Sequence, residues 1–159
     1  MRVSGKTIKE HIQLLTPLFG IIAAVWALRF FLGQIGAPAW LIQPFSVTLI
    51  VPVCIILMTL LIRVKRFGGY PSVIVGAFLL VVWSQLLIVA AILLSVFGGM
   101  DNIFTAPEFS PQNDPQHSRH IIGHLTSGIG LLTLFSSLMG CVLLFMLRRI
   151  HPKSGARKK

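Results

Sequence analysis

Of the 159 residues in this chain, 55% are apolar and only 11% are charged. Water-soluble domains carry about 25% charged residues, so this composition excludes an ordinary soluble domain. The high apolar content and the two cysteines also exclude a disordered chain and a disulfide scaffold. The formal net charge is +10, and in so apolar a chain such an excess is typical of cytoplasmic membrane loops, so we expect no nucleic-acid partner.

Four apolar segments are long enough to cross a bilayer. A hydrocarbon core of about 30 Å needs roughly 20 apolar residues in a helix. A lone segment in lipid satisfies its backbone hydrogen bonds only when it is helical. We therefore predict an all-α integral membrane protein, with residues 1–159 forming one transmembrane domain whose four helices pack as an up-down bundle. The predicted helices cover residues 8–33, 40–63, 71–97 and 115–149.

The first predicted helix begins with a capping signal and carries an arginine near its far end. Thr7 followed by Glu10 fits a capping box, so this helix should begin near Ile8. Within the apolar runs themselves, residues 14–32, 40–62, 73–97 and 121–147, Arg29 is the one charged residue, about one turn from the outer end. A cation there reaches the interface at modest cost. We expect Arg29 to form a salt bridge with Asp101 of the outer loop, and snorkelling to lipid phosphate is the alternative.

Most of the positive charge gathers at one end of the predicted helices. The positive-inside rule therefore places both termini in the cytoplasm and the basic tail, residues 150–159, against anionic lipids of the inner leaflet. We expect a bacterial cytoplasmic membrane, because no eukaryotic sorting signal is present. Twelve of the fourteen basic residues lie on that side: Arg2, Lys6, Lys9, Arg63, Lys65, Arg66, Arg148, Arg149, Lys153, Arg157, Lys158 and Lys159.

Two polar residues, Ser84 and Gln85, lie near the middle of the third predicted helix, and we expect both to make polar contacts between helices. An amide at the centre of a bilayer needs a hydrogen-bond partner, so Gln85 should face another helix. A structural contact between helices is the simpler interpretation, and a substrate site is the alternative. The expected partners are hydroxyl groups at comparable depth, those of Ser46, Thr48 and Ser136.

The predicted outer loop, residues 98–114, joins the third and fourth helices. It contains prolines, which restrict the chain, and two aromatic residues that need cover, Phe104 and Phe109. These features predict an ordered lid over the outer end of the bundle. A plain connector is the alternative interpretation.

Three of the five histidines fall within eight residues at the start of the fourth predicted helix. Asp114 followed by Pro115 predicts the start of that helix, because aspartate caps helices well and proline suits the first position. Spacings of three and four residues then place the histidines on one face, where they can share a transition-metal ion or offer an axial ligand to haem. Contacts to the loop, to a partner subunit or to a pH-dependent interface are the alternatives. The predicted ligand set is His117, His120, His124, Asp114 and Glu108.

No motif for catalysis is recognisable in the chain. It contains no P-loop, no serine-hydrolase elbow and no C-x-x-C, and the four apolar runs contain no paired carboxylates. We therefore expect a non-catalytic accessory or scaffold subunit, packed against other membrane subunits or a second copy through small residues of the fourth helix. The first alternative is a metal- or haem-binding membrane protein, and the second is a small carrier or channel for an uncharged solute.

Overall fold

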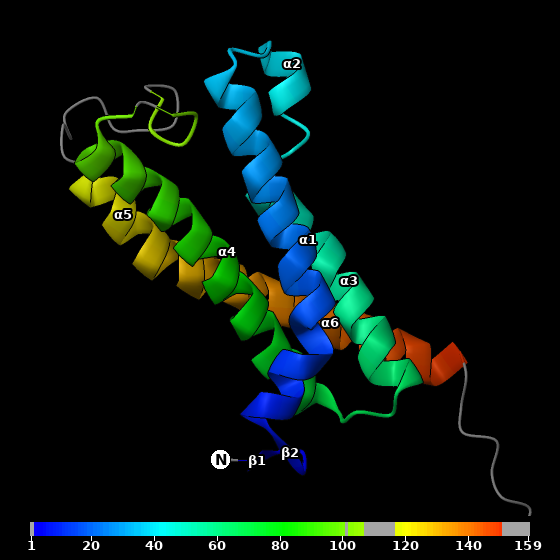
Figure 1. The fold of residues 1–159 in the computed structure, drawn as a ribbon. Helices are drawn as coiled ribbons and strands as arrows, with labels where there is room; N and C mark the ends of the chain where they lie inside the picture. The colour runs from blue at the N-terminus through cyan, green and yellow to red at the C-terminus, as the bar shows by residue number, and fades with distance from the viewer. Residues whose placement is uncertain (1, 101, 107–116, 151–159) are drawn as a thin grey trace, which may run out of the picture.

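The computed structural model describes residues 2–100, 102–106 and 117–150 (Figure 1). A short antiparallel hairpin of β1 (Arg2–Val3) and β2 (Lys6–Thr7) comes first, and the rest of the secondary structure is helical. The helices are α1 (Ile8–Gln34), α2 (Ala39–Ile42), α3 (Val47–Val64), α4 (Tyr70–Gly98), α5 (Ser118–Gly123), the π-helical turn η1 (His124–Gly128) and α6 (Ile129–Ile150).

The all-helical class of the protein is confirmed, as are four helical segments long and apolar enough to cross a membrane. Within the described residues these segments are Ile8–Gln34, Ala39–Val64, Tyr70–Gly98 and Ser118–Ile150. In Figure 1 the α1–α3 connection lies at the opposite end of the molecule from the α3–α4 connection. We call the end with the α1–α3 connection the predicted outer end. Its placement outside the cytoplasm stays a prediction.

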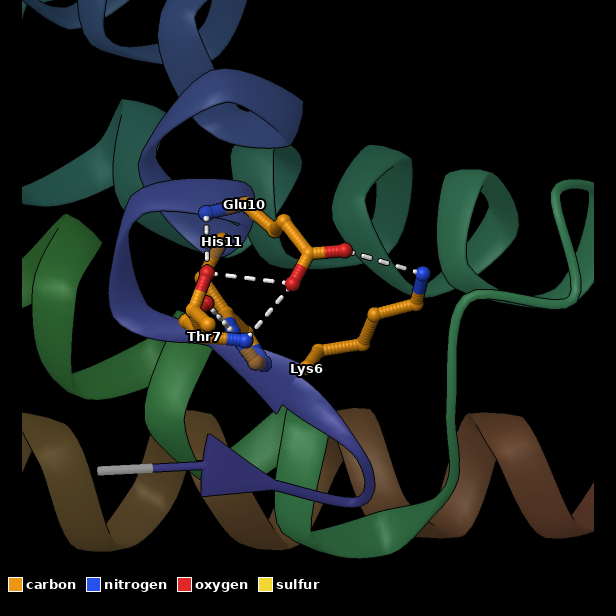
Figure 2. A network of polar contacts seen from close by, with 4 residues as sticks. All are labelled: Lys6, Thr7, Glu10 and His11. Atoms are coloured by element: carbon orange, nitrogen blue, oxygen red, sulfur yellow. Dashed lines mark hydrogen bonds and ion pairs between the residues drawn. The ribbon is translucent and has the colours of Figure 1, made fainter.

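The predicted capping box at the start of α1 is confirmed (Figure 2). The Thr7 hydroxyl accepts a hydrogen bond from the Glu10 amide at 3.2 Å, and the Glu10 carboxylate accepts one from the Thr7 amide at 2.8 Å. The sequence did not predict the preceding hairpin, which turns at Ser4 and Gly5 with φ angles of 52° and 80°. Two residues with positive φ are what a tight two-residue turn requires.

His11 ties the start of α1 to the loop between α3 and α4. Its Nδ1 donates to the Thr7 carbonyl oxygen at 2.8 Å, and its ring meets the edge of Phe67 with centroids 4.9 Å apart. The ammonium group of Lys6 lies 5.4 Å from the centroid of the same Phe67 ring and pairs with Glu10 at 3.0 Å. The N-terminal hairpin is therefore held at the end of the molecule opposite to the outer end.

The prediction that the second helix is one continuous element is wrong. The sequence pattern predicts a helix over residues 40–63, whereas α2 ends at Ile42 and α3 begins at Val47. Pro44 explains the break, because proline has no amide hydrogen and its ring clashes with the carbonyl four residues earlier in a helix. Ser46 has extended backbone and precedes the first residue of α3. This break places Ser46 and the first turn of α3 beside the cavity described below.

The centre of the molecule is α4, which packs against α1, α3 and α6 and is the most buried of the four spanning segments. Helix α6 comes close to its neighbours at Gly140. A Cβ atom there would lie 2.6 Å from Cγ1 of Val73 in α4 and 3.2 Å from Oγ1 of Thr59 in α3. A glycine at this crossing lets three helices meet, whereas α1 and α3 diverge from α4 and α5 toward the outer end (Figure 1).

Candidate functional site

The fourth spanning segment begins later than predicted and contains a π-helical turn. Asp114 and Pro115, the predicted start, lie outside the described residues. Among the described residues helix α5 begins at Ser118, and His117 precedes it with a left-handed φ of 51°. The sequence predicts that His117 lies on the first turn of this helix. In the structure it lies before the first turn instead. The turn η1 then holds one extra residue per turn, a feature that is frequent at functional sites.

Two of the three predicted histidines meet in this segment. His120 of α5 and His124 of η1 have ring centroids 4.8 Å apart, and their Nε2 atoms lie 3.0 Å from each other. A spacing of four residues along a helix brings two side chains to the same face, one turn apart. The two imidazoles therefore form a pair whose nitrogen atoms point toward one another.

Gln85 of α4 holds the second ring of this pair. The Gln85 side chain is buried, and its Oε1 lies 2.6 Å from Nδ1 of His124. An amide oxygen only accepts hydrogen bonds, so Nδ1 of His124 carries the hydrogen in this arrangement and its Nε2 keeps a lone pair. Nε2 of His120 then donates to that lone pair. The three side chains form a hydrogen-bonded series, Gln85–His124–His120, that links α4 to the fourth spanning segment.

Gln85 bonds to His124 and not to one of the hydroxyl groups that were expected as its partners from their similar depth along the helices. Ser46 and Thr48 line the neighbouring cavity, and the buried Ser136 lies on α6. The Ser84 hydroxyl, predicted to make a contact between helices, donates to the Val81 carbonyl oxygen of its own helix at 2.7 Å. Such a bond satisfies a buried hydroxyl locally, so Ser84 makes no contact to another helix through it. Gln85, in contrast, contacts His124, and the neighbouring Trp83 donates to the Phe19 carbonyl oxygen of α1 at 3.1 Å.

Gly128 makes room for Gln85, and the sequence analysis missed it. A Cβ atom on Gly128 would lie 2.7 Å from Oε1 of Gln85. That distance is shorter than side chains tolerate, so a larger residue would push the amide away from His124. The available signal was a glycine four residues after His124, on the same side of the helix.

A cavity of about 320 Å³ opens beside the histidine pair. Its polar lining comes from three parts of the chain: Arg29 of α1, Ser46 and Thr48 at the start of α3, and His120 and His124. Its apolar lining is Val47, Ile88, Ile103 and Phe104. Small-molecule sites have this size and this mixture of apolar walls with a few polar groups.

The described part of the outer loop covers Arg29. The Asn102 side chain donates to the Ala91 carbonyl oxygen at 2.8 Å and accepts from the Phe104 amide at 2.9 Å. These bonds bury Phe104, which is 7% exposed, and place its ring centroid 5.6 Å from Cζ of Arg29. Residues 102–106 therefore pack onto the bundle. Asp101, the predicted partner of Arg29, and Phe109 lie outside the described residues.

The predicted metal ligands are only partly placed. Asp114 and Glu108 lie outside the described residues, and His117 precedes α5. Within residues 2–100, 102–106 and 117–150, no group of three or more histidine, cysteine or acidic side chains is placed to hold a metal ion. The structure therefore places two of the five predicted ligands together, His120 and His124.

Together the fold and the cavity define a helical protein of the membrane type, with four apolar segments and a polar site near one end. Comparison with protein families, curated proteins and solved structures finds no match to this chain.

Proposed function

We propose that the protein is a metal-binding membrane protein in which His120 and His124 hold one transition-metal ion. The observation that supports this proposal is the 3.0 Å separation of their Nε2 atoms. Two nitrogen atoms bound to one tetrahedral zinc ion, each at about 2.1 Å, lie about 3.4 Å apart. A slight outward rotation of either ring is enough to admit an ion between them.

The Gln85 side chain supports the same proposal. A histidine that binds a metal through one nitrogen usually donates its other ring N–H to an oxygen acceptor, which fixes the ring and its tautomer. Oε1 of Gln85 is such an acceptor for Nδ1 of His124, at 2.6 Å. Imidazole ligands suit zinc, copper, nickel and iron. A haem takes one histidine on each axial side of its iron, so a close pair favours a single ion over haem.

We propose further ligands from the segment that precedes α5. His117, Asp114 and Glu108 lie just before the histidine pair in the chain, and their side chains suit a site that already has two imidazoles. Coordination positions of the metal ion that these side chains leave open would be filled by water or by an external ligand. Such a site would bind the metal ion, or pass it on, at the predicted outer end.

Elemental analysis of the purified protein tests this proposal. Protein from cells grown with ample zinc, copper, nickel and iron is expected to carry about one ion per chain, since two imidazoles and a carboxylate make a usable site. His120→Ala and His124→Ala should each lose that ion, whereas the control His151→Ala in the predicted basic tail should keep it. His117→Ala, Asp114→Asn and Glu108→Gln assign the remaining ligands. Metal-free wild-type protein from such cells would contradict the proposal.

A specific observation favours a second role, that of accessory or scaffold subunit. Gly123 and Gly130 are exposed, and a Cβ atom on either would meet no atom within 4 Å. Small residues in membrane helices are typical of contacts between helices, and these two have no such contact within the described residues. We propose that another membrane subunit or a second copy covers this face. The role is compatible with metal binding.

Native mass spectrometry of the protein extracted in a mild polymer tests the subunit role. The wild type is expected to carry a second polypeptide, and Gly130→Leu should lose it because a leucine side chain prevents close approach of a helix. Leu131→Ala, beside Gly130 on the helix, is the matched control for an altered apolar surface. A wild-type protein that is always a lone chain would overturn this role.

We also propose a location and an orientation for the protein. It would lie in a bacterial cytoplasmic membrane, with both termini in the cytoplasm and residues 150–159 against anionic lipids, because the basic residues gather at that end. A carrier or channel for an uncharged solute is the weaker alternative. The cavity near Gln85 would serve it, but Arg29 in the lining suits a charged ligand better.

A further inference from the structure

We infer that the outer cavity binds a phosphate group and that Arg29 recognises it. This inference stands apart from the metal proposal, because the arginine and two hydroxyl residues carry it, not the histidine pair. The phosphate could belong to a phospholipid head group or to a free phosphate compound, and the experiment below separates these sources.

Arg29 is a charged residue within a spanning segment, partly buried and lining the cavity. Arg29 lies five residues before the end of α1, where an arginine extends its guanidinium to the level of lipid head groups at modest cost. The guanidinium group has five donors in a planar fork that matches two phosphate oxygens at once. The ring of Phe104 lies near the guanidinium, with its centroid 5.6 Å from Cζ. The fork has enough donors to serve both a protein contact and a ligand.

Two hydroxyl residues line the same cavity. Ser46 immediately precedes α3, but its side chain makes no capping hydrogen bond with that helix. Thr48 lies in the first turn of α3 and is exposed. Hydroxyl groups donate readily to phosphate oxygens. Ser46 and Thr48 therefore add donors from α3 and its start to the guanidinium donors that Arg29 brings from α1 to the same cavity.

The size and the apolar part of the cavity suit a phosphate that is attached to a larger molecule. A volume of about 320 Å³ corresponds to roughly ten water molecules at about 30 Å³ each. Val47 and Ile88 supply apolar walls beside the polar groups. The cavity also lies toward the end of α1, and the ends of a helix that spans a bilayer lie near the level where lipid head groups meet the hydrocarbon core. A phospholipid would place its phosphate at Arg29 and its glycerol and first methylenes against these walls.

The test uses full-length protein from which metal has been removed by a chelator, so that its result does not depend on the metal proposal. Wild type, Arg29→Gln, Arg29→Lys and the control Arg63→Gln are reconstituted in nanodiscs of phosphatidylglycerol, released, and weighed by native mass spectrometry. Wild type and control are expected to retain one phospholipid that Arg29→Gln loses. Arg29→Lys, which keeps the charge but not the fork, should retain it in a fraction at least several-fold smaller.

A second arm titrates inorganic phosphate into the same proteins in detergent and follows thermal unfolding. A rise in melting temperature for the wild type but not for Arg29→Gln, without retained lipid, would assign the site to a free phosphate compound. If Arg29→Gln does not fold, the comparison of Arg29→Lys with the wild type decides the matter. Equal lipid retention and equal response to phosphate in the wild type and the arginine variants would overturn the inference.

Discussion

Gly140→Leu is expected to lower the melting temperature of the purified protein by roughly 10 °C or more, or to prevent its recovery in folded form. The physical reason is the meeting of three helices at this residue. A Cβ atom alone would lie 2.6 Å from Cγ1 of Val73 and 3.2 Å from Oγ1 of Thr59. Both neighbours are fully buried, so neither can move aside without shifting its helix. Gly140→Ala should show a smaller loss, about 1–3 kcal/mol.

Gly20→Leu is the matched control, because it adds the same side chain to an exposed glycine inside a long helix, α1. A Cβ atom at Gly20 meets nothing within 4 Å, so the melting temperature should stay within a few degrees of the wild type. Thermal unfolding followed by fluorescence-detected size exclusion gives both numbers. Equal losses in the two variants would mean that α6 does not cross α3 and α4 at Gly140.

The spanning segments follow from the sequence because hydropathy and length are local properties. Four apolar runs of roughly 20 residues predict four helices, and the capping box of Thr7 and Glu10 predicts the first residue of α1. Pro44 was the readable signal for the break between α2 and α3, but the apolar character of the surrounding run concealed it. The hairpin is harder to predict, since two strands of two residues leave little pattern around Ser4 and Gly5.

The sequence predicted which polar residues form the candidate site, but it did not predict which of them contact one another. The four-residue spacing predicts that His120 and His124 share a face, and burial in a membrane predicts that Gln85 needs a partner. The partnership between Gln85 and His124 depends on the relative tilt and depth of two helices. Counting residues from the helix ends could not give that depth, because the start of the fourth segment is displaced and η1 alters its rotation. Gly128 is informative only once that pairing is known.

Gln85→Leu is expected to weaken metal binding by about 10- to 100-fold without preventing folding. Leucine has nearly the volume of glutamine but cannot accept a hydrogen bond. Nδ1 of His124 would lose its 2.6 Å contact with Oε1, so its ring would be free to rotate and to adopt the other tautomer. The lost bond should also cost about 1–3 kcal/mol of stability, because the N–H group stays partly buried without an acceptor. Metal titration with a competing chelator measures the change in affinity.

Two further variants separate orientation of the ring from general damage to α4. Ser84→Ala changes the neighbouring residue, whose hydroxyl bonds only to its own helix at 2.7 Å, and metal affinity should stay at the wild-type value. Gln85→Glu keeps an oxygen acceptor for Nδ1 of His124 and should retain most of the affinity lost in Gln85→Leu, since carboxylates commonly orient metal-bound histidines. If Gln85→Leu binds metal as tightly as the wild type, then Gln85 only joins two helices and does not prepare His124 to bind the ion. A loss in Gln85→Leu that Gln85→Glu restores would instead show that an acceptor at residue 85 prepares His124 to bind.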